Sequence, residues 1–88
     1  MEKLDALNQV AEFHRTFRHP ILPEPTIPAE ERCRLRVALL AEELEELQDA
    51  IKDKDIVEVA DALCDMQYVL IGAVLEFGLG EKFKALFD

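Results

Sequence analysis

Two pairs of carboxylates are the strongest candidates for a reactive site in this chain of 88 residues. Glu43 and Glu46 lie in RVALLAEELEELQDAI (36–51), and Glu58 and Asp61 lie in DIVEVADALCDMQYVLIG (55–72). Within each pair the residues are three positions apart, so on an α-helix both side chains point to the same side. Each pair can therefore present its oxygen atoms to one ligand.

The helix predicted to run from about Pro28 to Lys52 carries its acidic pair on an otherwise apolar face. At about 100° per residue, Glu43 and Glu46 fall on the side that also carries Leu35, Leu39 and Ala50. The opposite face is expected to meet solvent, and it holds Glu45, Asp49 and Lys52. The acidic pair thus interrupts a face that should be buried.

The next predicted helix, 55–77, is apolar around nearly its whole circumference, which is typical of a helix buried on all sides. Its main polar stripe is acidic and consists of Glu58, Asp61, Asp65 and Glu76. The turn KDKD (52–55) is so short that the two helices must be antiparallel neighbours. The turn therefore folds the first acidic pair back toward the second.

Carboxylates that face a protein interior need a positive partner, because each buried ion loses hydration and like charges repel. Basic residues are scarce between positions 36 and 76, where only Arg36, Lys52 and Lys54 occur. Magnesium accepts oxygen ligands and keeps waters that a substrate phosphate can replace. The sequence predicts a magnesium site, with Mn²⁺ as a possible substitute.

The remaining segments complete an all-α antiparallel bundle within a single domain, 1–88. A first amphipathic helix is expected at 2–18, where His14 is either a base contact or a core histidine. Four prolines make 19–28 an extended strap, and EKFKALFD (81–88) begins a fourth helix. One chain of this length cannot cover the helix at 55–77, so a homodimer or homotetramer is expected.

The composition of the chain argues against some classes of binding partner. The net charge of -9 argues against a nucleic acid polymer or an anionic membrane, because no basic cluster balances it. Cys33 and Cys64 lie at apolar helix positions without metal-ligand spacing. They are interpreted as free, buried thiols, which suits a cytoplasmic protein.

The acidic segments resemble the ExxE and ExxD pair of the all-α nucleoside triphosphate pyrophosphohydrolases. The matching residues are EELEE (42–46) and, after a short turn, EVAD (58–61). That superfamily includes MazG-like proteins, dimeric dUTPases and phosphoribosyl-ATP pyrophosphohydrolase. The stretch FHRTFRHPILPEPTIP (13–28) also looks like the entry segment of one of its branches.

The resemblance implies a magnesium-dependent enzyme that cleaves a nucleoside triphosphate between its α- and β-phosphates, releasing a monophosphate and pyrophosphate. By similarity, the metal ligands would be Glu43, Glu46, Glu58 and Asp61. Glu42 is a candidate general base, although an exposed helix glutamate explains it equally well. Candidate substrate contacts are His14, Asp65 and Tyr68, of which Asp65 could also touch the metal and Tyr68 could simply pack in the core.

Two other interpretations compete with the enzyme. The chain could be a non-enzymatic acidic helical domain for oligomerisation or interaction, whose acids pair with a basic partner. A di-iron carboxylate bundle needs Glu-x-x-His pairs, whereas His14 and His19 lie outside the acidic helices.

Overall fold

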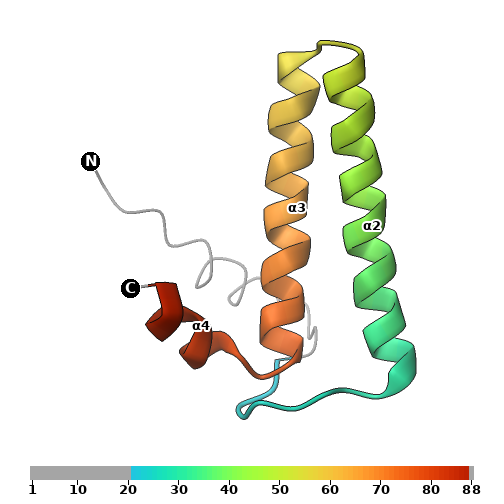
Figure 1. The fold of residues 1–88 in the computed structure, drawn as a ribbon. Coiled ribbons are helices and arrows are strands. Elements are labelled where there is room, and N and C mark those ends of the chain that lie inside the picture. Colours follow the sequence, from blue (N-terminus) through green and yellow to red (C-terminus); the bar gives the residue numbers. More distant parts are fainter. Residues whose placement is uncertain (1–20, 88) are drawn as a thin grey trace. The chain divides into compact units, whose positions relative to one another are not determined.

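The computed structural model of the protein describes residues 21–87, with side chains up to residue 86. The described chain forms three helices: α2 (Glu30–Lys52), α3 (Ile56–Glu76) and α4 (Gly80–Phe87) (Figure 1). The predicted all-α class is confirmed, and each helix lies within two residues of its expected bounds. The helix expected at 2–18, including His14, lies outside the described residues.

Helices α2 and α3 are consecutive and antiparallel, and their turn is fixed by hydrogen bonds at both ends. Lys54 has a left-handed backbone (φ 55°), and the amide of Asp55 donates to the Ala50 carbonyl at 3.1 Å. The Asp55 carboxylate then accepts from the amides of Val57 and Glu58, each at 3.1 Å. Asp55 therefore caps the start of α3, as its residue type favours.

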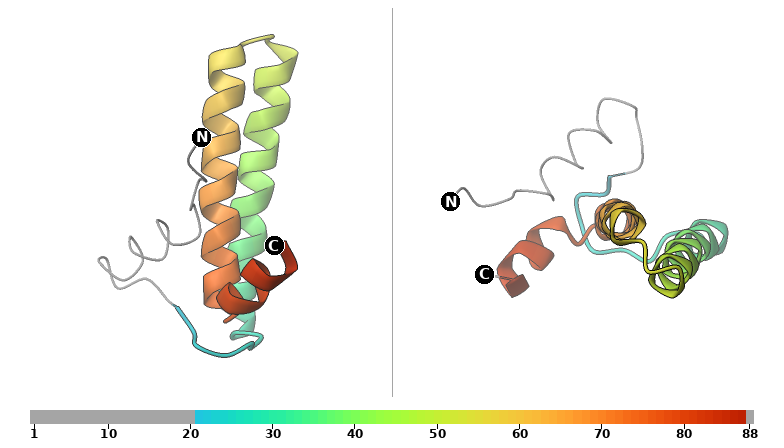
Figure 2. Two further views of the ribbon diagram at one scale, coloured as in Figure 1. Left: turned by 90° about the vertical axis from the view of Figure 1, so that its left-hand side faces the viewer. Right: turned by 90° about the horizontal axis from the view of Figure 1, so that it is seen from above.

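The chain divides into two compact units. One unit is Ala29–Leu70, which contains α2 and most of α3. In it the two helices lie side by side, as both views of Figure 2 show. The described part of the other unit consists of residues 21–28 and 71–87. Because α3 runs through both units, the single domain expected at 1–88 stays a prediction.

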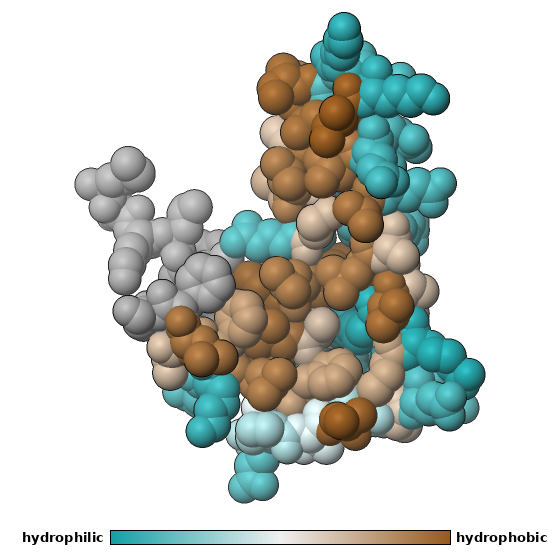
Figure 3. Space-filling view, viewed as in Figure 1, coloured by the Kyte–Doolittle hydropathy of each residue, from teal (hydrophilic) through white to brown (hydrophobic). Residues whose placement is uncertain are grey.

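The burial of α3 differs from the expectation that it is covered on all sides. Its second half carries most of the core, including Val69, Ile71, Val74 and Leu75. Nearer the turn, Ile56 and Val57 are 76% and 73% exposed, and Leu63 and Cys64 are exposed as well. Among residues 21–87, α2 is the one helix beside this part of α3, so α3 buries one face against it. Figure 3 shows apolar side chains gathered along this part of α3.

Residues 21–28 cover the end of α3, as expected of a stiff strap. The Leu22 amide donates to the Leu75 carbonyl at 3.1 Å, and the Thr26 amide donates to the Phe77 carbonyl at 2.8 Å. Carbonyls at a helix C-terminus have no partner within the helix. The strap supplies those partners and fixes the end of the helix that carries Asp61 and Asp65.

No single helix in the described chain is long and apolar enough to cross a membrane, and α3 with α4 meets that criterion only as a bent pair, which carries little weight.

Gly78 is required where the chain leaves α3. Its φ of +68° lies in the left-handed region, and an added Cβ would collide with the backbone carbonyl of Glu24 in the strap. Glycine reaches this conformation without a steric penalty. Gly80, two residues later, has space for a methyl group, because an added Cβ there would be 3.5 Å from Leu75 Cδ2.

We expect Gly78→Ala to destabilise the fold by more than about 2 kcal/mol, since the left-handed penalty of ~1–2 kcal/mol adds to the collision with the strap. Gly80→Ala is the matched control and should change stability by less than ~0.5 kcal/mol. Urea unfolding followed by circular dichroism measures both. Equal midpoints for the two variants would contradict the close approach of the strap.

Candidate functional site

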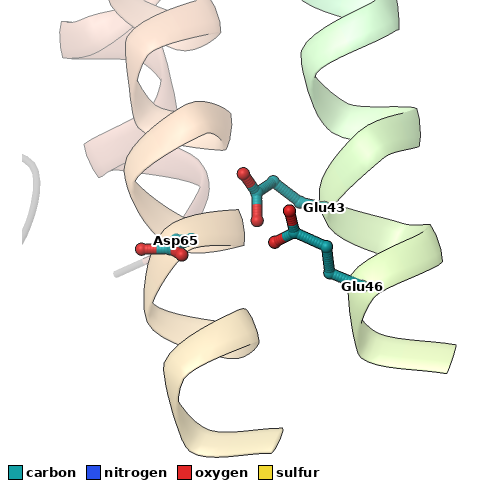
Figure 4. Close-up of side chains that lie close together, drawn as sticks. All are labelled: Glu43, Glu46 and Asp65. Carbon is teal, nitrogen blue, oxygen red and sulfur yellow. The ribbon is translucent and has the colours of Figure 1, made fainter. Parts of the chain in front are cut away.

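Three carboxylates from the two acidic helices converge on one point. Glu43 and Glu46 project from α2 toward α3, and Asp65 lies opposite them on α3 (Figure 4). Each residue offers one oxygen, and all three oxygens lie within 4.8 Å of one another. The i, i+3 spacing places the two glutamates on one side of α2, and the antiparallel turn brings Asp65 to them.

Glu43 is the most enclosed of the three. It is half-buried, and its Oε2 atom is shielded from solvent with no hydrogen-bond partner among the described residues. Burial raises the pKa of its carboxyl group above the ordinary value, and a hydrogen bond with Glu46 and repulsion from Glu46, Asp65 and Glu42 raise the pKa further. Glu43 is therefore more easily protonated than an ordinary glutamate, and its ionised form is stabilised by a cation beside it.

A groove of about 510 Å³ runs between the helices from this cluster toward the turn. It is lined by Glu46, Asp49, Ala50, Asp53, Glu58, Asp61, Ala62 and Asp65. Ala50 and Ala62 are buried, 6% and 4% exposed. Because alanine side chains are small, they do not fill the groove, and the carboxylates line the open space.

Both predicted acidic pairs contribute to this region, but in different ways. Glu43 and Glu46 belong to the converging cluster, and Asp65 joins them. Glu58 and Asp61 line the same groove as Glu46 but lie outside the group of oxygens within 4.8 Å. Their role as metal ligands stays a prediction, whereas the position of Asp65 fits the extra metal contact considered for it.

The expectation that these acids face a protein interior is wrong for the single chain. Glu46, Glu58, Asp61 and Asp65 are all exposed, and only Glu43 is partly enclosed. Two helices can exclude water along their line of contact but cannot roof the groove beside it. An open groove leaves the acids accessible to an ion or a substrate.

Sequence reasoning missed two groove residues, Asp49 and Asp53. Asp49 was assigned to the solvent face, and Asp53 was treated only as part of the turn. Both line the groove with Glu46. Asp49 follows Glu46 by three residues and Asp53 follows Asp49 by four, so the three acids continue one helical stripe. That spacing was the signal available in the sequence. The side of α2 that faces the groove therefore includes Asp49 as well as the face predicted from Leu35, Leu39 and Ala50.

Asp55 and Glu58 have the spacing of a capping box, in which Glu58 would serve to start α3, but only the backbone amide of Glu58 takes part in the cap. In a capping box the glutamate would accept from the amide of the N-cap residue. That amide, on Asp55, donates to the Ala50 carbonyl instead. The Glu58 carboxylate lines the groove.

Two other predicted site residues lie on the described helices, Glu42 on α2 and Tyr68 on α3. Glu42 is exposed, and it is near enough to Glu43 to raise the pKa of that residue. Tyr68, one turn beyond Asp65 on α3, is half-buried. Burial raises the pKa of its hydroxyl group, and the positive charge of Arg36 partly offsets this increase.

The chemistry of the cluster suits a hard metal ion. Its ligand atoms are all carboxylate oxygens, which are preferred by Mg²⁺, Ca²⁺ and Mn²⁺. A cation at this point would also give the solvent-shielded Oε2 atom of Glu43 the partner it lacks. The residues therefore fit a hard divalent metal ion.

Comparison with known families agrees with this chemistry. The sequence model of phosphoribosyl-ATP pyrophosphohydrolase, part of the MazG-like superfamily, matches residues 10–88. No curated protein matches the sequence significantly. The family match includes both acidic helices and supports a pyrophosphohydrolase activity on a nucleotide. The resemblance predicted from the two acidic motifs is confirmed: the chain belongs to the phosphoribosyl-ATP pyrophosphohydrolase family.

Proposed function

We propose that the protein is a magnesium-dependent nucleoside triphosphate pyrophosphohydrolase. It cleaves between the α- and β-phosphates and releases a nucleoside monophosphate and pyrophosphate. The observation that carries this proposal is the convergence of Glu43, Glu46 and Asp65 within 4.8 Å in a chain of this family.

The proposed metal ligands are Glu43, Glu46 and Asp65. Glu58 and Asp61 line the same groove, and we propose that they contact the metal when the substrate is bound. When bound, magnesium neutralises phosphate charge and helps to orient the attacking water. The all-oxygen donors, the solvent-shielded Oε2 atom of Glu43 and the open groove support this assignment.

The acids of the chain also make entry of the substrate depend on the ion. Six carboxylates line the groove, so a bare triphosphate is repelled from it. Only a substrate whose charge is neutralised by metal can settle between α2 and α3. The groove thereby selects a metal-bound polyphosphate over a free one.

Glu42 is the proposed general base. It precedes Glu43 on α2 and is exposed, so its carboxylate remains hydrated and available to accept a proton from water. A base must lie within hydrogen-bond reach of that water, and the border of the metal cluster is a suitable position. Tyr68 and, outside the described residues, His14 are proposed to contact the nucleoside.

The proposal includes a homo-oligomer. Ile56, Val57, Leu63 and Leu70 on α3 are 76%, 73%, 49% and 42% exposed. A second copy of the hairpin would cover them and complete a four-helix core. Removing apolar surface from water stabilises a complex by about 25 cal/mol per Å². A single chain with these exposed side chains is therefore expected to associate with another.

We expect millimolar Mg²⁺ or Mn²⁺ to raise the melting temperature, because the ion binds the folded carboxylate cluster and not the dispersed acids of the unfolded chain. At a free ion concentration of ~100 times Kd the gain is about 2.7 kcal/mol. Thermal melts with and without metal measure it. Glu46→Gln should lose most of the shift, and the matched exposed variant Glu45→Gln should keep it. Equal shifts in the two variants would show that the acids are ordinary surface charge.

Without metal, Glu43→Gln should leave stability unchanged or raise it. Because the folded-state pKa of Glu43 lies above its ordinary value of 4.5, its ionisation destabilises the fold as pH rises from that value through the folded pKa. Glutamine removes this charge at nearly constant shape. Metal-free melts at pH 7 measure the difference. A clear loss of stability would indicate instead that Glu43 is one half of a structural ion pair.

Activity separates the enzyme from a non-enzymatic interaction domain. Glu43→Gln, Glu46→Gln, Glu58→Gln and Asp61→Asn should each reduce magnesium-dependent pyrophosphate release by about 100-fold or more, since each removes one negative charge from the metal cluster or from the groove beside it. Glu45→Gln should stay within about twofold of wild type. Asp49→Asn does not serve as a control, because Asp49 lines the groove. The substrates are canonical and modified nucleoside triphosphates and phosphoribosyl-ATP.

Two results would count against the enzyme. Release of orthophosphate without pyrophosphate would exclude cleavage between the α- and β-phosphates. Turnover of no substrate in the panel, together with retained metal binding, would favour the interaction domain.

Light scattering at micromolar concentration tests the oligomer. We expect at least a dimer. Leu63→Glu, which places a charge on the exposed apolar part of α3, should shift the species toward the monomer, whereas Glu45→Gln should not. A monodisperse wild-type monomer would contradict this part of the proposal.

A further inference from the structure

The groove extends beyond the metal cluster of Glu43, Glu46 and Asp65 toward the turn between α2 and α3. It has a volume of about 510 Å³, and every residue that lines it belongs to the compact unit Ala29–Leu70. Besides Glu46 and Asp65, its lining consists of two alanines and four more carboxylates. We call these four carboxylates the turn-side acids: Asp49, Asp53, Glu58 and Asp61. The groove thus contains more carboxylates than the three that converge on one point.

Asp49 and Asp53 are not explained by the folding of α2. Asp49 lies in the last turn of this helix, and Asp53 is its C-cap residue. The backbone carbonyls give this end of a helix a partial negative charge, so acidic side chains are unfavourable there. Both side chains are exposed, and within the described chain no hydrogen bond or ion pair involves either carboxylate. The two carboxylates are therefore available to a ligand in the groove.

The chemistry of the turn-side acids restricts what can lie beside them. Ionised carboxylates only accept hydrogen bonds and carry negative charge, so a phosphate group approaches them only when a cation lies between. A ligand with more negative charge needs more cations, and these cations need more carboxylates. Of the two products of the proposed reaction, pyrophosphate carries more negative charge than a nucleoside monophosphate. The turn-side part of the groove, which adds four carboxylates to the cluster, therefore suits metal-bound pyrophosphate.

We propose that the turn-side part of the groove is the subsite for the pyrophosphate leaving group, and that Asp49 and Asp53 hold the metal ions that accompany it. This inference rests on the proposed function, because it takes the metal cluster as the site of phosphate cleavage. It adds two residues that lie outside both acidic motifs, EELEE (42–46) and EVAD (58–61). It also gives the substrate a direction, since the pyrophosphate points toward the turn and the nucleoside extends away from it.

The first test asks whether the two aspartates serve the fold. Without metal, Asp49→Asn and Asp53→Asn should each leave the melting temperature unchanged or raise it, because each removes an unfavourable charge from the end of α2. Thermal melts followed by circular dichroism measure the change. A clear fall in the melting temperature of both variants would show that these carboxylates are structural and would overturn the inference.

The second test measures binding without turnover. Inorganic pyrophosphate is titrated into the protein by calorimetry in excess Mg²⁺. Asp49→Asn and Asp53→Asn should each weaken its binding about tenfold, the effect of one charged contact. Glu45→Gln removes the same charge from an exposed position of α2 and should stay within about twofold of wild type. A wild type that binds no pyrophosphate, or equal losses in the aspartate and Glu45 variants, would overturn the inference.

Product inhibition tests the direction of the substrate. In Asp49→Asn, pyrophosphate should inhibit hydrolysis about tenfold more weakly than in wild type, whereas inhibition by the nucleoside monophosphate should be unchanged. Glu46→Gln belongs to the metal cluster and should weaken the binding of Mn²⁺ alone, which Asp49→Asn should largely retain. If Asp49→Asn relieved inhibition by the monophosphate and not by pyrophosphate, the substrate would lie in the opposite direction and the inference would be wrong.

The two proposals fail in different ways. If the wild type hydrolyses no nucleotide, the proposed function fails, whatever the calorimetry of pyrophosphate shows. If hydrolysis is intact and neither Asp49→Asn nor Asp53→Asn changes the binding of pyrophosphate, only the pyrophosphate subsite is refuted.

Discussion

Mutual repulsion of the carboxylates in the groove is the constraint on which the rest of the structure depends. Glu43, Glu46 and Asp65 present oxygens within 4.8 Å of one another, and no arrangement of like charges so close is stable without support from elsewhere. The covalent turn and the packing of the hairpin hold them there. Ala50 and Ala62 are buried beneath the groove, and their small size leaves room for the acids above. The same repulsion that makes the cluster unfavourable without an ion also favours the binding of a cation there.

Both ends of α3 are fixed, and this holds the acidic stripe in place. At the start, the Asp55 carboxylate accepts hydrogen bonds from two backbone amides. At the end, the strap donates to carbonyls at Leu75 and Phe77, and Gly78 allows the strap to pass close by. These contacts are made by the backbone or by one short side chain. The groove acids are therefore not needed to hold the helix and remain free to bind a ligand.

The same hairpin leaves its apolar residues near the turn uncovered. Ile56 and Val57 are exposed on α3, within a few residues of Glu58 and Asp61. Helix α3 therefore has two separate requirements. Its exposed apolar side chains need to be covered, and its acidic side chains need a cation. In our proposal the first is met by a second copy of the chain and the second by magnesium with its nucleotide. Folding, assembly and substrate binding would then depend on one another.

The sequence by itself determined the helices, their order and the family. Apolar periodicity, prolines and glycines are local signals, and they placed α2, α3 and α4 within two residues of their observed bounds. The i, i+3 spacing likewise identified Glu43 and Glu46 as a pair. The acidic motifs were sufficient to indicate the family, because residue type and separation along the chain carry that resemblance.

Only the tertiary structure decided which acids meet and how open the site is. Asp65 joins Glu43 and Glu46, and Asp49 and Asp53 line the groove, because these relations depend on the rotation and offset of one helix against the other. Helical periodicity does not fix either quantity. Exposure was also beyond the sequence: an apolar circumference predicts that α3 needs covering, but the amount of cover within one chain depends on how many helices surround it. In the part of the chain that the structure describes, α2 alone lies beside the turn-proximal half of α3, and the groove and the apolar residues there are exposed.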